Sequence, residues 1–171
     1  IGFIFQFYNL LPVLTAKKNV EIPLLLTNLS GSQRKEHVAT ALDVVGLSDR
    51  GGHKPNELSG GQQQRVGIAR SLAVEPDVWF LDEPFSALDP LIRKQMQDEF
   101  LRIQSIQKKS VVFITHDFQE ALRIADRIAL MRDGQIVQIG EPVDLILSPK
   151  DNYVREFTKD VPWESVLQAS D

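Results

Sequence analysis

The hydrophobic positions of the chain follow two different spacings. Short apolar runs at residues 1–5, 78–81 and 111–115 are typical of β-strands, and the last two hold so few polar residues that burial on both faces is predicted. Elsewhere, apolar residues recur every three or four positions, which is the spacing of an amphipathic helix. The clearest helical series is Val38, Ala41, Leu42 and Val45. Strands that alternate with helices predict an α/β fold with a largely parallel sheet.

Residues that begin and end helices refine these bounds. Ser59 suits the N-cap of a helix that continues to about residue 73, and Pro90 suits the first turn of a helix that continues to about residue 107. Gly46 is suited to the position just after a helix. Asp133-Gly134 lies between two β-prone runs and predicts a hairpin. Shorter helices are predicted over residues 117–125, 141–147 and 152–159, and a loosely held tail over 161–171.

The composition narrows the classes of protein that fit. With 171 residues, 43% hydrophobic and 25% charged, the chain suits one globular domain. Its net charge of −4 argues against nucleic acid as a partner, because nucleic-acid binders usually carry a basic face. The absence of cysteine excludes disulfides and thiolate metal sites, and it suits a reducing cytosol. No apolar run approaches the roughly 20 residues of a membrane-spanning helix, so a membrane is expected to matter only through a partner.

The apolar run 78–81 ends in two adjacent acids, Asp82 and Glu83. Ligands of parallel α/β sheets bind beyond the carboxyl ends of the strands, where these two side chains are expected to lie. One carboxylate can hold Mg²⁺ that keeps much of its water, and the next can orient a water molecule for attack on a phosphate. Taken alone, the pair fits a solvated acidic turn equally well.

A second group of residues could bind an anion. In Leu58-Ser59-Gly60-Gly61-Gln62, the glycines let the backbone N–H groups of a helix start approach a phosphate closely. On its own, Ser-Gly-Gly fits ordinary helix capping better. Three further features are weak singly: Gln6 and His116 each follow a predicted strand, and residues 86–89 precede a helix.

Together, and in this order, these residues resemble the motif series of the ABC ATPase superfamily. Gln6 matches the Q-loop, and Leu58–Gln62 matches the signature sequence. Val78–Glu83 matches the Walker B strand, Ser86–Asp89 the D-loop and His116 the switch histidine. A signature sequence followed by a Walker B strand is highly specific to this family.

The resemblance covers about residues 1–140 and implies a fold. It implies a P-loop NTPase-like domain over residues 1–160, in which a helical subdomain of about residues 7–75 is inserted into the α/β core. The tail at 161–171 resembles the start of a linker to a further regulatory module. Family members form head-to-tail dimers that hold two ATP molecules, and they act on membrane permease subunits at the cytoplasmic face of the cell membrane.

The resemblance also implies roles for individual residues. Asp82 and Gln6 would hold Mg²⁺, Glu83 would polarise the attacking water, and His116 would contact the γ-phosphate. Gln6 would also sense the nucleotide and relay its presence to a membrane subunit. The ATP held by a second copy of the chain would be bound by Ser59, Gly60, Gly61, Gln62 and Asp89.

One departure from the family pattern is large. The phosphate loop G-x-x-x-x-G-K-[ST] is missing, since none of the ten glycines precedes a lysine. In the family this loop lies upstream of Gln6. The 171 residues are therefore expected to be an N-terminally truncated domain that binds ATP weakly or not at all, with an exposed sheet edge and reduced stability.

The type of transporter is less sharply indicated. Residues 85–160 resemble the importers of quaternary amines (glycine betaine, proline, choline), whereas residues 5–24 resemble lipoprotein and macrolide exporters. The back half favours import. An ABC ATPase of DNA repair or chromosome upkeep is the alternative outside transport, although the chain has neither sustained heptads nor a basic block. The other alternative outside transport is a regulatory fragment without catalytic activity.

An apolar segment follows the first predicted strand. Such a patch predicts a docking surface, here over residues 7–26, for a helix of a membrane subunit. Packing of the same side chains into the core is the alternative. The apolar residues are Phe7, Tyr8, Leu10, Leu11 and Val13.

Overall fold

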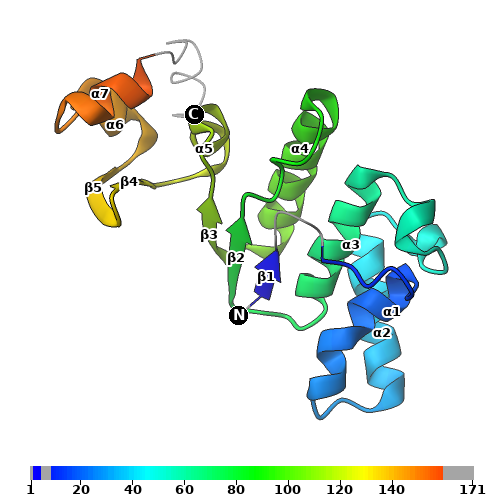
Figure 1. Ribbon diagram of the computed structural model, residues 1–171. Coiled ribbons are helices and arrows are strands. Elements are labelled where there is room, and N and C mark those ends of the chain that lie inside the picture. Colours follow the sequence, from blue (N-terminus) through cyan, green and yellow to red (C-terminus); the bar gives the residue numbers. More distant parts are fainter. Residues whose placement is uncertain (1, 5–8, 160–171) are drawn as a thin grey trace. The chain divides into compact units, whose positions relative to one another are not determined.

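A computed structural model describes residues 2–4 and 9–159 of the chain (Figure 1). The chain divides into two compact units, residues 1–114 and residues 115–171. None of the helices within residues 9–159 is both long and apolar enough to cross a lipid bilayer.

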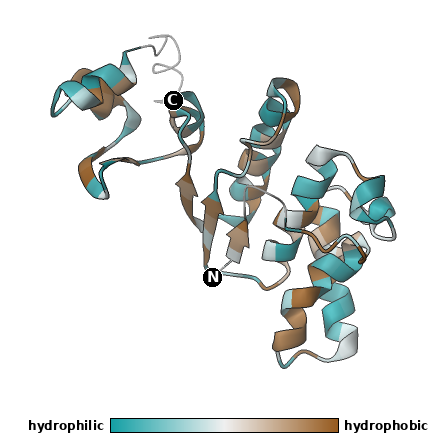
Figure 2. Ribbon diagram, viewed as in Figure 1, coloured by the Kyte–Doolittle hydropathy of each residue, from teal (hydrophilic) through white to brown (hydrophobic). Residues whose placement is uncertain are grey.

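The first unit contains a parallel sheet of three strands. These are β1 (Gly2–Ile4), β2 (Val78–Asp82) and β3 (Ser110–Ile114), in the order β1-β2-β3. Figure 2 shows that the strands are predominantly hydrophobic. All three run in the same direction, and Asp82 pairs with Ile114 at their carboxyl ends. The predicted parallel sheet is confirmed, and Asp82 lies at the edge where such sheets bind ligands.

The other elements of the first unit are helical. Ser59 caps its helix and Pro90 begins the next one, as predicted. Gly46 has a φ of +65°, the left-handed conformation that suits a residue just beyond a helix. The elements are α1 (Ala16–Glu21), η1 (Ile22–Leu26), α2 (Gly31–Val44), η2 (Ser48–Arg50), η3 (Pro55–Glu57), α3 (Gly60–Leu72) and α4 (Pro90–Gln107).

An aromatic cluster forms the core between the sheet and α4. The Phe100 ring of α4 lies 6.3 Å from the rings of Trp79 and Phe85 and 6.1 Å from that of Phe113, measured between centroids. Trp79, Phe85 and Phe100 are fully buried. Aromatic pairs at these separations add to the stabilisation that burial alone provides.

The prediction that β2 and β3 are buried on both faces is wrong. Trp79 and Leu81 are buried on the face toward α4, but Val112 and Ile114 on the opposite face are 44% and 50% exposed. Phe3, 54% exposed, stacks on Phe80 on that same face. An unbroken apolar run permits burial on both faces but does not show how many faces the neighbouring elements cover. Among the described residues of the first unit, α4 packs on the face of the sheet that carries Trp79 and Phe113.

Two arginines from later helices hold the end of α2. Arg65 of α3 donates a hydrogen bond to the Val45 carbonyl at 3.3 Å, and Arg102 of α4 donates one to the Val44 carbonyl. Glu99 in turn accepts hydrogen bonds of 2.9 and 2.8 Å from Arg102. The last carbonyls of a helix lack partners within it, so these bonds tie α2 to α3 and α4.

Acid is expected to weaken this tie. The hydrogen bonds from Arg102 hold the pKa of Glu99 below its ordinary value of 4.5. A carboxylate with a lowered folded pKa stabilises the fold above its unfolded pKa, and that contribution is lost as the pH falls through the folded value. The pair is partly exposed, so we expect Glu99→Gln to cost about 0.5–1 kcal/mol at pH 7. The cost should shrink as the pH falls below 4.5.

Urea unfolding at neutral and acid pH measures this difference. Glu36→Gln is a matched control, because Glu36 is exposed on α2. A loss of stability in Glu99→Gln that is the same at both pH values would contradict the prediction.

Over residues 115–159, the second unit consists of a hairpin and three short helices. The elements are α5 (Phe118–Ile124), β4 (Ile128–Arg132), β5 (Gln135–Gly140), α6 (Pro142–Leu147) and α7 (Asn152–Thr158). The predicted hairpin turn is confirmed, since Asp133 and Gly134 both have positive φ, +51° and +75°. The unit packs around its own core, formed by Phe118, Leu122, Ile128, Leu130, Leu145 and Val154.

Candidate functional site

The end of β2 carries Glu83 in a strained conformation. Its φ is +43°, in the left-handed region that non-glycine residues rarely adopt. Its N–H donates a hydrogen bond of 2.9 Å to the Ile114 carbonyl, so the end of β3 holds this backbone in place. Such strain costs about 1–3 kcal/mol and is concentrated at functional sites. The sequence marked Glu83 by its chemistry, and the structure shows that its backbone is fixed at the carboxyl end of the sheet.

The turn after Glu83 is held by its own hydrogen bonds. The Ser86 hydroxyl donates to the Glu83 carbonyl at 2.9 Å, and the Asp89 carboxylate caps α4 by accepting from the Ile92 N–H at 3.1 Å. Arg93 donates to the Leu88 carbonyl at 3.1 Å and to the Ser86 carbonyl at 3.5 Å. Residues 86–89 therefore have a defined shape. Sequence reasoning missed Arg93, because nothing in the local pattern separates it from a solvated arginine.

The predicted anion-binding group begins α3. The Ser59 hydroxyl accepts from the Gln62 N–H at 3.3 Å, and the Gln62 side chain accepts from the Ser59 N–H at 2.9 Å. This reciprocal capping fixes the first turn of a helix of 13 residues. Ser59 is exposed and Gly60 is half-buried. A helix start of this kind presents backbone N–H groups and the positive end of the helix dipole to an anion.

Gly61 has a packing role that the sequence did not reveal. A Cβ atom at this position would lie 3.0 Å from Cγ2 of Ile92 and 3.6 Å from the Met96 sulfur. The first turn of α3 thus approaches α4 closely, and a side chain at Gly61 would crowd Ile92. Within the first unit, this contact brings the predicted anion-binding group next to the helix that Asp89 caps.

The remaining predicted site residues lie elsewhere. Gln6 falls outside the described residues. His116 belongs to the second unit, where it is exposed at the bend before α5. Asp117 caps α5 by accepting hydrogen bonds from two backbone N–H groups, at 3.0 and 3.2 Å, which fixes the backbone beside His116. The prediction that His116 and Gln6 act at the same site as Glu83 stays a prediction.

The carboxylates present fit Mg²⁺ better than a metal enclosed by protein ligands. Within residues 2–4 and 9–159, no group of three or more histidine, aspartate or glutamate side chains is placed to hold a metal ion. Asp82 is an exposed carboxylate at the carboxyl end of a parallel strand. Mg²⁺ keeps several waters and often binds proteins through one or two carboxylates together with substrate phosphates.

A comparison with protein families decides the classification. Residues 1–86 match the family model described as ABC transporter. The chain belongs to this family. Its sheet and helices also match the ATP-binding cassette MJ0796, in a dimeric structure bound to ADP and Pi, with a TM-score of 0.67 and 38% identity over 82% of this chain and 62% of that one. The predicted P-loop NTPase-like fold of ABC ATPases is therefore confirmed.

Curated relatives in the ABC transporter family narrow the subgroup. The trimethylamine N-oxide transport system ATP-binding protein TmoW of Pelagibacter ubique is 55% identical over all of this chain and 50% of its own length. The glycine betaine/proline betaine transport system ATP-binding protein ProV of Escherichia coli is 44% identical over all of this chain and 43% of its length. The chain thus spans about half the length of these relatives. The matches to these relatives extend over the whole chain, including its front half. The predicted resemblance of the front half to exporters stays a prediction.

Proposed function

We propose that this chain supplies the ATP-binding and ATP-hydrolysing part of an ABC importer for quaternary amines and related osmoprotectants. The observation that carries the proposal is the match of the whole chain to ATP-binding proteins named for trimethylamine N-oxide and for glycine betaine/proline betaine transport, at 55% and 44% identity. As part of the same proposal, residues 1–160 form one nucleotide-binding domain whose helical subdomain spans about residues 7–75.

Each residue of the proposed site would have its own role in ATP binding and hydrolysis. Asp82 and Gln6 would hold Mg²⁺, which neutralises phosphate charge when it is bound. Glu83, on its fixed backbone, would orient the attacking water and accept its proton. His116 would contact the γ-phosphate, and Gln6 would sense the nucleotide and relay its presence to a membrane subunit. The tight turn of residues 86–89 and the anchored start of α3 suit groups that must be positioned before the reaction.

A second copy of the chain would complete the site. Ser59, Gly60, Gly61, Gln62 and Asp89 would bind the ATP held by that copy in a head-to-tail dimer. The exposure of Ser59 and Asp89 supports this, because both remain accessible to a partner. The matched structures of MJ0796 are described as dimeric, which is consistent with the proposal.

The membrane subunits of the transporter would dock on the segment before α2. Phe7 and Tyr8 of the predicted surface lie outside the described residues. Leu11 and Val13 are 48% and 75% exposed, and Leu26 at the end of η1 is 93% exposed. Exposed apolar side chains gathered in one segment favour docking over packing into the core. The chain would then work as a peripheral subunit on the cytoplasmic face of the inner membrane.

A hybrid protein tests the proposed function. Residues 1–171 contain no phosphate loop, so they would replace the matching segment of ProV in an Escherichia coli strain that lacks ProV. We expect this hybrid to restore glycine betaine uptake. A hybrid that is produced at normal levels and hydrolyses ATP but gives no uptake would contradict the proposed import function.

A further inference from the structure

Residues 9–14 form a loop that exposes apolar side chains and has no helix or strand of its own. We call this segment the apolar loop. Leu11 and Val13 are exposed, and the loop's one internal backbone hydrogen bond runs from the Leu14 N–H to the Leu11 carbonyl, at 3.1 Å. A loop with so little regular structure would normally move freely. An anchor outside the loop is needed to keep Leu11 and Val13 in fixed positions.

Asn19 of α1 provides that anchor. Its side chain is fully buried. The Oδ1 atom accepts a hydrogen bond of 2.7 Å from the Leu11 N–H, while Nδ2 lies 3.1 Å from each of three carbonyl oxygens, those of Leu11, Leu14 and Thr15. The amide carries two hydrogens, so one of them is shared between two carbonyls. One buried side chain thus binds the backbone of the loop in its middle, at Leu11, and at its end, at Leu14.

These partners require an asparagine. Leu11 presents an N–H that needs an acceptor, and the Leu14 carbonyl needs a donor. The Leu11 and Thr15 carbonyls also accept from the backbone N–H groups of Leu14 and Asn19. Aspartate could satisfy only the Leu11 N–H, and its charge would face three carbonyl oxygens without a counter-ion. Alanine would leave the Leu11 N–H and the Leu14 carbonyl without this partner, which is costly for groups that are shielded from water.

A second contact ties the same loop to the helix that begins at Ser59. Arg70 lies near the end of α3 and donates a hydrogen bond of 2.7 Å to the carbonyl of Asn9. Burial lowers the pKa of the Arg70 guanidinium. The apolar loop is therefore fastened at its start to α3 and along its length to α1, so a displacement of α3 would be passed to it.

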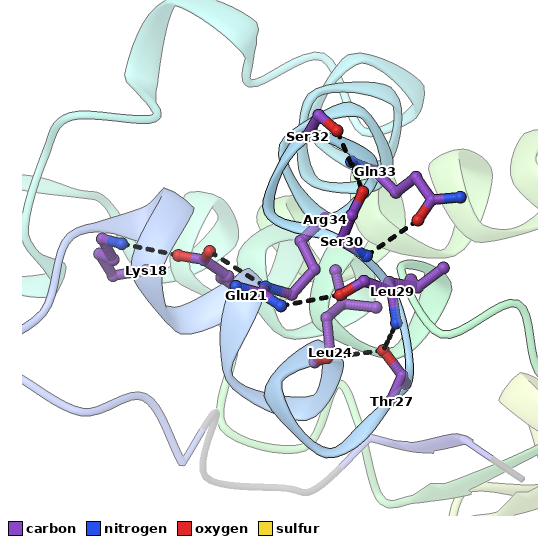
Figure 3. Close-up of polar contacts among 9 residues, drawn as sticks. All are labelled: Lys18, Glu21, Leu24, Thr27, Leu29, Ser30, Ser32, Gln33 and Arg34. Atoms are coloured by element: carbon purple, nitrogen blue, oxygen red, sulfur yellow. Dashed lines mark hydrogen bonds and ion pairs between the residues drawn. The ribbon is translucent and has the colours of Figure 1, made fainter.

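The backbone near Leu25 and Leu26 is also held by polar side chains (Figure 3). Glu21 contacts Lys18 at 2.7 Å and Arg34 at 3.7 Å. Arg34 donates to the Leu29 carbonyl at 2.9 Å, and the Thr27 hydroxyl donates to the Leu24 carbonyl at 2.6 Å. Exposed apolar residues thus sit on restrained backbone both before α1 and after it. Restraint of this kind reduces the entropy lost when a partner binds.

We infer that Asn19 is a positioning residue that holds the apolar loop in the shape required by the membrane subunit. The inference rests on the proposed function, because it takes the permease as the partner that contacts Leu11 and Val13. Asn19 itself touches neither nucleotide nor partner and acts through the loop. Its loss should therefore separate ATP hydrolysis from transport.

The test compares Asn19→Ala with the parent hybrid of residues 1–171 in ProV. We expect the Leu11 amide to exchange its hydrogen about tenfold faster or more, while amides within α4 keep their rates. Uptake of glycine betaine should fall by about tenfold, while ATP hydrolysis by the purified hybrid stays within about twofold. Crosslinking to the permease from Val13→Cys should fall in parallel with uptake. Asn152→Ala is the matched control, because Asn152 is exposed at the start of α7, away from the proposed docking segment.

Each other outcome overturns the inference in a recognisable way. If the parent hybrid itself fails to support uptake, the proposed function fails and the inference fails with it. With a working parent, unchanged exchange at Leu11 in Asn19→Ala would show that the loop does not depend on this side chain. Faster exchange with unchanged uptake and crosslinking would show that the loop shape is not needed for docking. Faster exchange throughout the first unit would mean that Asn19 acts on general stability alone.

Discussion

Replacement of Glu83 by glutamine is expected to reduce ATP hydrolysis by the ProV hybrid by about 10²–10⁴-fold, the usual contribution of a positioned general base. Glutamine preserves the shape of the side chain but removes the charge that, in the proposed function, orients water and accepts its proton. The backbone hydrogen bond to the Ile114 carbonyl does not involve the side chain, so the turn should persist. Nucleotide should therefore still bind while the chemical step stalls. Phosphate release by the purified hybrid measures the rate, and sizing with ATP and Mg²⁺ measures the trapped dimer.

Glu75→Gln is a close control for this experiment. Glu75 has the same unusual left-handed backbone, with a φ of +48°, but it follows α3 rather than the end of β2. Its replacement should leave hydrolysis within about twofold of the parent. Equal rates for Glu83→Gln and the parent would show that Glu83 is not the base. Equal loss in both variants would point to an effect of glutamine on left-handed backbone rather than on chemistry.

Truncation of Phe100 to alanine should destabilise the chain by about 3–5 kcal/mol, the range measured for buried Phe→Ala changes. The ring is 1% exposed and contacts three other aromatic rings that come from β2, from β3 and from the turn before α4. The surrounding side chains belong to separate elements and cannot all collapse into the space that the ring leaves. The cavity would therefore cost free energy in addition to the lost burial. Urea unfolding, followed by tryptophan fluorescence because Trp79 lies in this cluster, measures the change.

Leu91→Ala in the same helix is the control. Leu91 is 67% exposed, so its truncation should change stability by no more than about 0.5 kcal/mol. Comparable losses in the two variants would contradict the assignment of Phe100 to the core of the first unit.

The sequence predicted those features whose causes are local. The starts of α3 and α4 follow from Ser59 and Pro90, and the hairpin turn follows from Asp133-Gly134, because capping and turn preferences act over a few residues. The alternation of strands and helices was sufficient to predict the parallel sheet. The order of the motifs indicated the ABC family, which the family match confirms. That order depends only on which residues follow one another along the chain.

Long-range packing decided the features that the sequence did not predict. The apolar run of β3 reads as buried, yet Val112 and Ile114 are exposed, because burial depends on which elements cover each face of the sheet. The left-handed backbone of Glu83 is held by a carbonyl 31 positions away in the sequence (114 − 83 = 31). The close approach of Gly61 to α4 also joins residues that are far apart in the sequence.

Asn19 shows the difference most clearly. Its four hydrogen bonds reach backbone groups only 4 to 8 positions away, which is local in the sequence. Nevertheless, an asparagine that follows two lysines in a short helix has no feature in the sequence that separates it from a solvated side chain. The sequence by itself indicated the family and the alternation of strands and helices, and it predicted the chemistry at the end of β2. Only the tertiary structure determined which polar groups are removed from water, and a polar side chain shielded from water must satisfy its hydrogen bonds within the protein.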